Sequence, residues 1–227
     1  SQDIKECMYI FDLDIDYVDT SAVDASYLPG NLGILSARGR QNNKNSIPNI
    51  GCLTRLYKLN LENREIDFNE LKKITKLKEL TFTEVYNENW KENIIELKEL
   101  RKLNITVATT YDYSVLEPLT KLETLKISYH GIMHREDQKS TTGLQVLTRL
   151  KRIEISYSCI DPIIFTGLKN LQSLSLINTS INDDLMQNIA TAPSLKSLTI
   201  SSFQPSHNSD KCVYIVGTMT NLTFLKW

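Results

Sequence analysis

Apolar residues recur along the chain in one spacing: apolar-x-x-apolar-x-x-apolar-x-apolar. A clear copy has Leu53, Leu56, Leu59 and Leu61 at the apolar positions. The final apolar-x-apolar pair has a period of two, so both side chains face the same side of a short strand. One such element cannot bury its apolar side alone, but a stack of parallel strands buries it continuously. The pattern therefore predicts a parallel sheet built from repeats.

The first residue of each apolar pair is called the anchor below. The anchors are Leu13, Leu35, Leu59, Leu80, Leu103, Leu125, Ile153, Leu174, Leu198 and Leu225. Seven of the nine intervals between these anchors are 21–24 residues, and the other two are 28 and 27. Between the copies, segments 68–74, 90–97 and 183–189 have apolar residues at helical spacing. We therefore expect each repeat to be a strand followed by a short helical return.

This spacing, with segments such as Leu116–Ile127, resembles the leucine-rich repeat family over essentially the whole chain. It is most similar to the class with roughly 22 residues per repeat, seen in internalins and some intracellular regulators. The resemblance implies an α/β fold: a right-handed horseshoe solenoid of about ten repeats, with a parallel inner sheet and short helices or turns on the convex side. We expect a single domain over residues 1–227, either a segment of a longer protein or one without a C-terminal cap.

One feature departs from the family pattern. The family usually has Asn three residues after the strand pair, where its amide links successive backbones. Here only Ser158 and Thr179 could supply a hydroxyl in that place. We therefore expect a less regular solenoid than the family ideal.

Composition narrows the range of partners. The formal net charge is -1 and the sequence pI is about 6.3, whereas nucleic-acid-binding domains usually have a pI above ~9. Apolar runs such as Met8–Phe11 and Val213–Val216 extend over four residues, or five with the preceding cysteine, far below the ~18 of a membrane span. We expect no nucleic acid and no membrane span.

The cysteines indicate the compartment. They are Cys7, Cys52, Cys159 and Cys212. They are spread over distant repeats and lack the clusters that form disulfide caps in extracellular relatives. This layout predicts reduced thiols and a cytoplasmic location; a secreted effector or a cell-surface protein stays open.

Catalytic and metal-binding motifs are weak. His130 and His134 lie across a strand end and a loop, which is poor context for a metal site. His207 lies beside Ser and Asp in one polar loop, whereas catalytic triads are assembled from distant segments. Nucleophile-elbow, phosphate-loop and zinc-protease motifs are missing from the sequence. We expect no catalysis, no cofactor and no metal.

The side of the sheet opposite the anchors provides the candidate binding surface. Ten strands at ~4.8 Å and about 18 Å of width give roughly 770 Å², close to the ~800 Å² per partner of a standard protein interface. The predicted binding residues are Lys102, Lys126, Tyr129, Arg152, Glu154 and Tyr157, with a secondary acidic patch of Asp12, Asp14 and Asp16. Two structural alternatives stay open: Lys58, Glu79 and Lys102 as a cross-strand ladder that needs no ligand, and the two tyrosines as packing residues.

These observations favour a non-enzymatic protein-interaction module that binds a macromolecular partner on its concave face, as an adaptor, pathogen effector or surface protein. The alternative is the substrate-recognition arm of a larger enzyme complex, such as a ubiquitin ligase or phosphatase holoenzyme. The polar insertions 130–143 and 204–211 are alternative binding elements. The apolar last strand, which includes Trp227, predicts edge-to-edge self-association or a covering partner.

Overall fold

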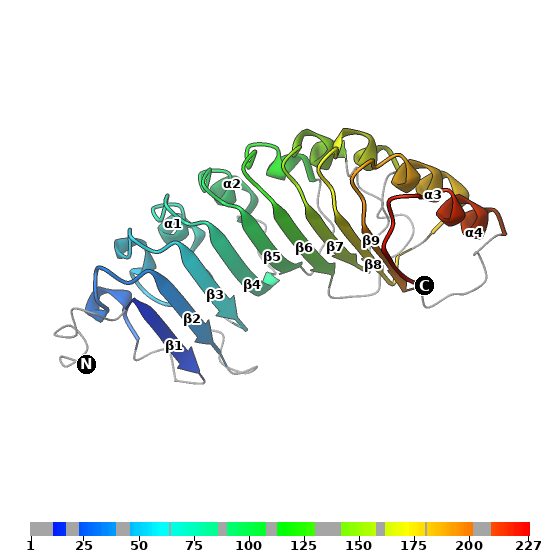
Figure 1. Ribbon diagram of the computed structural model, residues 1–227. Helices are drawn as coiled ribbons and strands as arrows, with labels where there is room; N and C mark the ends of the chain where they lie inside the picture. Colours follow the sequence, from blue (N-terminus) through cyan, green and yellow to red (C-terminus); the bar gives the residue numbers. More distant parts are fainter. Residues whose placement is uncertain are drawn as a thin grey trace. The chain divides into compact units, whose positions relative to one another are not determined.

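The computed structural model describes residues 11–16, 23–39, 46–63, 65–85, 90–107, 113–129, 142–157, 162–179, 181–201 and 210–227. The chain divides into two compact units, Ser1–Val107 and Ala108–Trp227. Figure 1 shows the strands of each unit side by side, with short helices along one side of the sheet.

The elements of the first unit are β1 Asp12–Asp16, η2 Ala25–Tyr27, β2 Ile34–Arg38, η3 Ile50–Cys52, β3 Lys58–Glu62, α1 Phe68–Leu71, β4 Glu79–Val85, α2 Trp90–Ile94 and β5 Lys102–Val107. Those of the second unit are η4 Tyr113–Leu116, β6 Thr124–Tyr129, η6 Thr142–Val146, β7 Arg152–Ser156, η7 Pro162–Gly167, β8 Ser173–Ile177, α3 Asp183–Ala190, β9 Ser197–Ser201, α4 Asp210–Gly217 and β10 Phe224–Lys226. The η elements are 3₁₀ helices, which suit such short returns.

The strands are parallel and lie in the order of the sequence within each unit. The anchors stand next to one another: Leu59 pairs with Leu80, and Leu80 pairs with Leu103. In the second unit Ile153 pairs with Leu174, and Leu174 with Leu198. The predicted α/β repeat fold, with its register, is confirmed.

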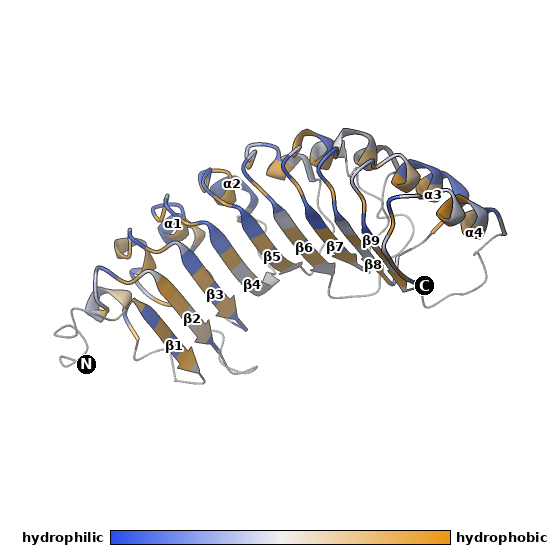
Figure 2. Cartoon of the chain, viewed as in Figure 1, coloured by the Kyte–Doolittle hydropathy of each residue, from blue (hydrophilic) through white to orange (hydrophobic). Residues whose placement is uncertain are grey.

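The anchors and the leucines before them form the core. Leu53, Leu56, Leu59 and Leu61 are all at most 2% exposed, and Figure 2 shows apolar and polar bands alternating along the strands. The returns add aromatic packing in the first unit, where the ring of Phe82 meets those of Phe68 and Trp90 edge-on at 5.8 and 6.3 Å. Burial of these stacked apolar side chains is the main source of stability.

Main-chain hydrogen bonds join the turns just before the strands begin. The N–H groups of Lys78 and Glu79 both donate to the carbonyl of Tyr57, at 2.8 and 2.9 Å. Arg101 and Lys102 donate in the same way to the carbonyl of Lys78, at 2.8 and 3.0 Å. The same arrangement recurs in the second unit, and we call it the two-amide clamp. It holds successive repeats in register with no contribution from a side chain.

The ends of several strands are marked by left-handed backbone. Asn63, Tyr157 and Asn178, each four residues after its anchor, have φ values of 53°, 58° and 52°. Asparagine tolerates this conformation, whereas a bulky residue such as tyrosine is strained by it. One residue after Asn178, the buried Thr179 donates its hydroxyl hydrogen to the carbonyl of Ile177 at 3.3 Å, within its own repeat; Ser158 lies outside the described residues.

The helical returns begin at side-chain caps. The carboxylate of Asp67 accepts hydrogen bonds from two amides of α1, and the side chain of Asn182 accepts one from Leu185 N–H of α3 at 2.8 Å. The carboxylate of Asp24 caps η2 and also accepts from the side chain of Asn49 at 2.9 Å. Hydrogen bonds from Ser26 first, and then from Asn49, lower the pKa of Asp24 below its ordinary value.

Candidate functional site

On the outward side of the first unit, charged side chains of β3, β4 and β5 pair across the strands. The carboxylate of Glu79 on β4 lies 3.8 Å from Lys58 Nζ on β3 and 2.6 Å from Lys102 Nζ on β5. The predicted cross-strand ladder is therefore present. Exposed ion pairs of this kind contribute ~0–1 kcal/mol each to stability. Lys102, which is one of the predicted binding residues, is therefore paired with Glu79 of its own chain.

The outward side of the second unit contains a similar cross-strand ion pair and also a cation, Arg152, that has no ion pair among the described residues. Lys126 on β6 and Glu154 on β7 are opposite each other, and their Nζ and Oε1 atoms are 2.8 Å apart. Arg152 begins β7 between Thr124 and Ser173 of the neighbouring strands. It is exposed, and within the described part of the chain its guanidinium forms no ion pair.

The two tyrosines predicted as binding residues differ in exposure. Tyr129 is 6% exposed, and its hydroxyl is 3.0 Å from that of Tyr113, whereas Tyr157 is 43% exposed. Tyr129 takes the packing role that the sequence left open, because β6 stays extended through this residue and its side chain points inward with Leu125 and Ile127. At the matching position of β7, the left-handed turn at Tyr157 takes the chain out of the strand.

The predicted acidic patch lies on the outer strand of the first unit. Asp12 and Asp14 are exposed on β1, and Asp16 stands opposite Arg38 of β2 in the backbone register. The guanidinium of Arg38 donates to the carboxylate of Glu62 at 2.8 Å. The strand is therefore an acidic edge beside an ion pair on β2 and β3.

The last repeat exposes apolar side chains. Tyr214 on α4 is 74% exposed, and Phe224, Leu225 and Trp227 are 53%, 45% and 42% exposed. The other anchors from Leu35 to Leu198 are at most 2% exposed. The predicted uncovered apolar strand is therefore observed, while what covers it stays a prediction.

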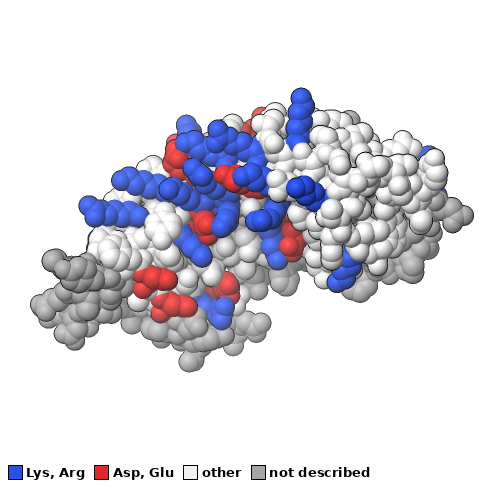
Figure 3. Space-filling model, viewed as in Figure 1, with Lys and Arg blue, Asp and Glu red and all other residues white. Residues whose placement is uncertain are grey.

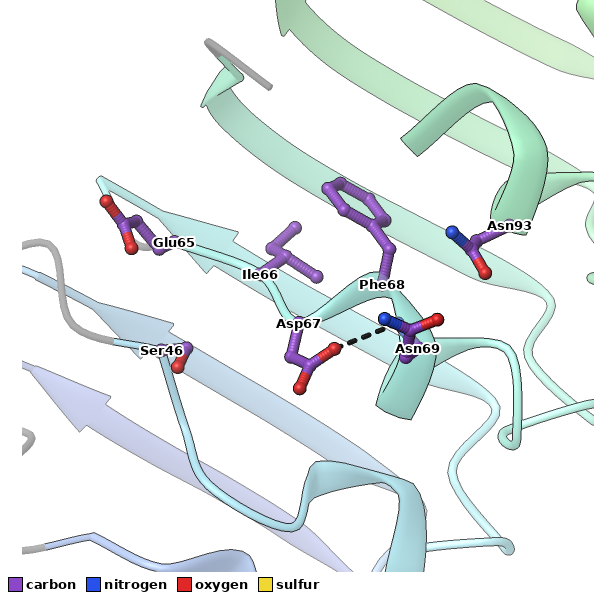
Figure 4. Close-up of a pocket in the computed structure, with 7 residues that line it drawn as sticks. All are labelled: Ser46, Glu65, Ile66, Asp67, Phe68, Asn69 and Asn93. Carbon is purple, nitrogen blue, oxygen red and sulfur yellow. Dashed lines mark hydrogen bonds between the residues drawn. The ribbon is translucent and has the colours of Figure 1, made fainter. Parts of the chain in front are cut away.

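The first unit also has a small polar pocket beside α1 (Figure 4). Its volume is about 260 Å³, and its lining residues are Ser46, Glu65, Ile66, Asp67, Phe68, Asn69 and Asn93. Small-molecule sites are usually 300–1,000 Å³ and mostly apolar. The carboxylate of Asp67 already accepts the Asn69 N–H at 2.9 Å, so the pocket offers weak support for a ligand site.

Other predictions concern metals, thiols and loops. In the described residues, His, Cys, Asp and Glu form no group of three or more suited to a metal ion. Cys52 is an exposed free thiol and Cys212 a buried one; Cys7 and Cys159 lie outside the described residues. His130, His134, His207 and most of both insertions also lie outside them.

Comparison with known families agrees with the geometry. A family model described as a leucine-rich repeat region matches residues 30–226. The chain belongs to the leucine-rich repeat family. Leucine-rich repeat proteins are generally interaction modules, so the chain is a protein-interaction repeat module. No curated protein matches it.

Solved leucine-rich repeat structures are similar in fold. Internalin C2 of Listeria monocytogenes has 21% sequence identity and a TM-score of 0.60, covering 86% of this chain and 80% of its own. Internalin F of the same organism has 17% identity and a TM-score of 0.47, covering 96% and 87%. The first comparison supports the internalin-like repeat fold. Among the described helices, none is long and apolar enough to cross a membrane.

Proposed function

We propose that this leucine-rich repeat chain is a non-enzymatic module that binds a protein partner on the outward side of its sheet, centred on β7 and β8 of the second unit. The observation that carries the proposal is the exposed guanidinium of Arg152, which has no ion pair among the described residues. An arginine fork pairs with a carboxylate through two hydrogen bonds. A partner carboxylate at Arg152 would therefore gain a contact that the fold itself leaves unused.

The surroundings of Arg152 favour contact with a protein surface. The outward positions on β8 and β9 include four hydroxyl residues, Ser173, Ser175, Ser197 and Thr199, and end at Ile177 and Ser201. Hydroxyl groups both donate and accept hydrogen bonds, and removing them from water costs far less than removing a charge. A partner can therefore cover these strands at low cost and still pair with the guanidinium of Arg152.

Tyr157 provides an aromatic contact at the end of β7. Its ring is 43% exposed and its backbone is held in a left-handed turn. Tyrosine and arginine are enriched among the residues that dominate interface energies. Arg152 at the start of β7 and Tyr157 directly after its end therefore support β7 as the centre of the interface.

The other predicted residues have lesser roles in the proposal. Lys126 and Glu154 pair with each other and border the contact area. Lys102 and the acidic patch belong to the first unit and form secondary contacts, whereas the buried Tyr129 supports β6 from the core.

The test compares two charge reversals, Arg152→Glu and Lys169→Glu. Lys169 is an exposed cation in the turn before β8, without an ion pair in the described residues, so the control changes the net charge equally. Each protein is immobilised, and bound proteins from an extract of its source cells are quantified by mass spectrometry. We expect Arg152→Glu to reduce capture of a specific partner at least tenfold and Lys169→Glu less than twofold.

Two outcomes would contradict the proposal. One is equal capture by all three proteins, and the other is loss of binding on deletion of residues 133–142 alone. Thermal unfolding checks that both variants fold, since surface substitutions usually cost under ~0.5 kcal/mol. Capture of a ubiquitin ligase or phosphatase subunit would identify the chain as the recognition arm of that enzyme.

A further inference from the structure

The turns that precede β3, β4 and β5 hold four cations that the fold leaves unpaired. They are Arg55, Lys76, Lys78 and Lys98, and we call them the basic turns. All four are exposed, and none has an ion pair or side-chain hydrogen bond among the described residues. The cations just after them, Lys58 and Lys102, are instead paired with Glu79. Among the described residues of the first unit, the unpaired positive charge thus lies in these turns.

The two-amide clamp places the turns that carry these cations next to one another. Lys78 N–H donates to Tyr57, and Arg101 N–H donates to Lys78, both at 2.8 Å, so these residues stand on adjacent turns at roughly the ~4.8 Å strand spacing. Like charges at neighbouring positions destabilise a sheet. Figure 3 shows Lys and Arg side chains gathered over the part of the first unit that holds β3, β4 and β5. The fold gains nothing from this concentration, which suits a negatively charged ligand.

We propose that the basic turns bind an extended acidic segment of another protein. Such a segment laid across the turns would bring its carboxylates to cations on three successive repeats. The exposed ring of Tyr57, which lies against Gly33, would give the segment an apolar contact beside Lys78. This surface is distinct from β7 and β8, so the inference goes beyond the proposed function and does not depend on it.

An acidic peptide fits these turns better than a nucleic acid does. Glu79 at the start of β4 and Glu99 in the turn before β5 lower the positive charge that a phosphate backbone would meet. The whole chain carries a formal net charge of -1, unlike typical nucleic-acid-binding domains. Non-specific binders of single strands also stack successive bases on successive aromatic rings, whereas among the residues 53–58, 74–79 and 97–102 only Tyr57 is aromatic.

The experiment measures fluorescence anisotropy with the full 227-residue chain. The probe is a labelled 12-residue peptide of alternating Glu and Ser, in ~50 mM and ~200 mM salt. The test variant is Lys76→Glu with Lys78→Glu. The matched control is Lys72→Glu with Lys73→Glu, which makes the same charge change on the α1 return of the same unit. Far-UV circular dichroism verifies that both variants fold.

We expect saturable binding that weakens at higher salt because charge pairing is screened. The Lys76/Lys78 variant should bind at least tenfold more weakly, and the Lys72/Lys73 control within twofold of the unchanged protein. Arg152→Glu should leave peptide binding intact, which separates this test from that of the proposed function.

Three results would overturn the inference. They are no saturable peptide binding, an equal loss in the control variant, and tighter binding of a 12-nucleotide oligo-dT or of phosphatidylserine vesicles with the same sensitivity to Lys76 and Lys78. The last result would assign the basic turns to a nucleic acid or a membrane surface instead of an acidic protein.

Discussion

Leu198 and Leu225 provide a matched pair of sites for measuring what burial contributes to this fold. Both are anchors, they stand side by side on β9 and β10, and they differ in exposure, at 0% and 45%. Replacing a fully buried leucine by alanine costs ~2–5 kcal/mol, because apolar contacts are lost and a cavity remains. Leu198→Ala should therefore cost about 3 kcal/mol, and Leu225→Ala about 1 kcal/mol, since only about half of its side chain is buried.

Urea unfolding followed by circular dichroism at 222 nm measures the difference. A change of about 3 kcal/mol corresponds to a loss of ~6–12 °C in Tm for a chain of this size. The slope of the free energy of unfolding against urea should be the same in both variants, because each exposes the same surface on unfolding. Both substitutions remove the same side chain from the same position within a repeat. The difference between the two free energies of unfolding therefore reports the difference in burial.

Equal costs at the two positions would refute this reasoning. They would mean that Leu225 is buried in solution, which requires a second copy or another partner over β10. Sedimentation velocity would then separate the two explanations, because self-association depends on the concentration of the chain. This is also the test of the predicted edge-to-edge contact.

Three further predictions follow from particular residues. Thiol titration under denaturing, non-reducing conditions should recover four free thiols, because the cysteines lie on distant repeats and Cys52 and Cys212 are free in the structure; fewer would indicate a disulfide. Tyr157→Asn should leave stability unchanged or raise it by up to ~1 kcal/mol, because asparagine tolerates the left-handed backbone; a loss above ~1 kcal/mol in urea unfolding would show that the ring packs. The stability that Asp24 contributes should be complete above its unfolded-state pKa of ~3.9 and be lost as the pH falls through its lowered folded-state pKa; a carboxyl NMR titration with an ordinary midpoint would disprove it.

The register of the sheet could be predicted from the sequence because burial enforces it. A shift of one residue would turn every anchor toward water, so Leu59, Leu80 and Leu103 have to stand side by side, as they do. The Lys58–Glu79–Lys102 ladder then follows directly, because residues next to aligned anchors are themselves aligned. The alternation of side chains along each strand, together with the pairing of the anchors, is therefore enough to predict which outward residues are neighbours.

The exposure of Tyr129 could not be predicted from its residue type. Tyr129 and Tyr157 occupy the same position in their repeats, but β6 continues through one of them and β7 ends before the other. Tyr129 is four residues after the anchor Leu125, so in an extended strand its side chain faces the same side as the anchors. A prediction that β6 extends through residue 129 would therefore have predicted the burial of Tyr129. Ends of strands depend on where the backbone turns, and Tyr157 lacks the asparagine that marks this turn at Asn63 and Asn178.

The two-amide clamp also bears on how this surface can evolve. The clamp uses main-chain atoms alone, and the residues at its centre in successive repeats differ widely in size and charge. The residues whose carbonyls accept both hydrogen bonds are Phe11, Gly33, Tyr57 and Lys78 in the first unit and Glu123, Lys151, Gln172 and Lys196 in the second. Nearly any amino acid except proline, which has no N–H to donate, satisfies this position. Point mutations here can therefore change the charge and shape of the turn surface while the backbone hydrogen bonds between repeats are preserved.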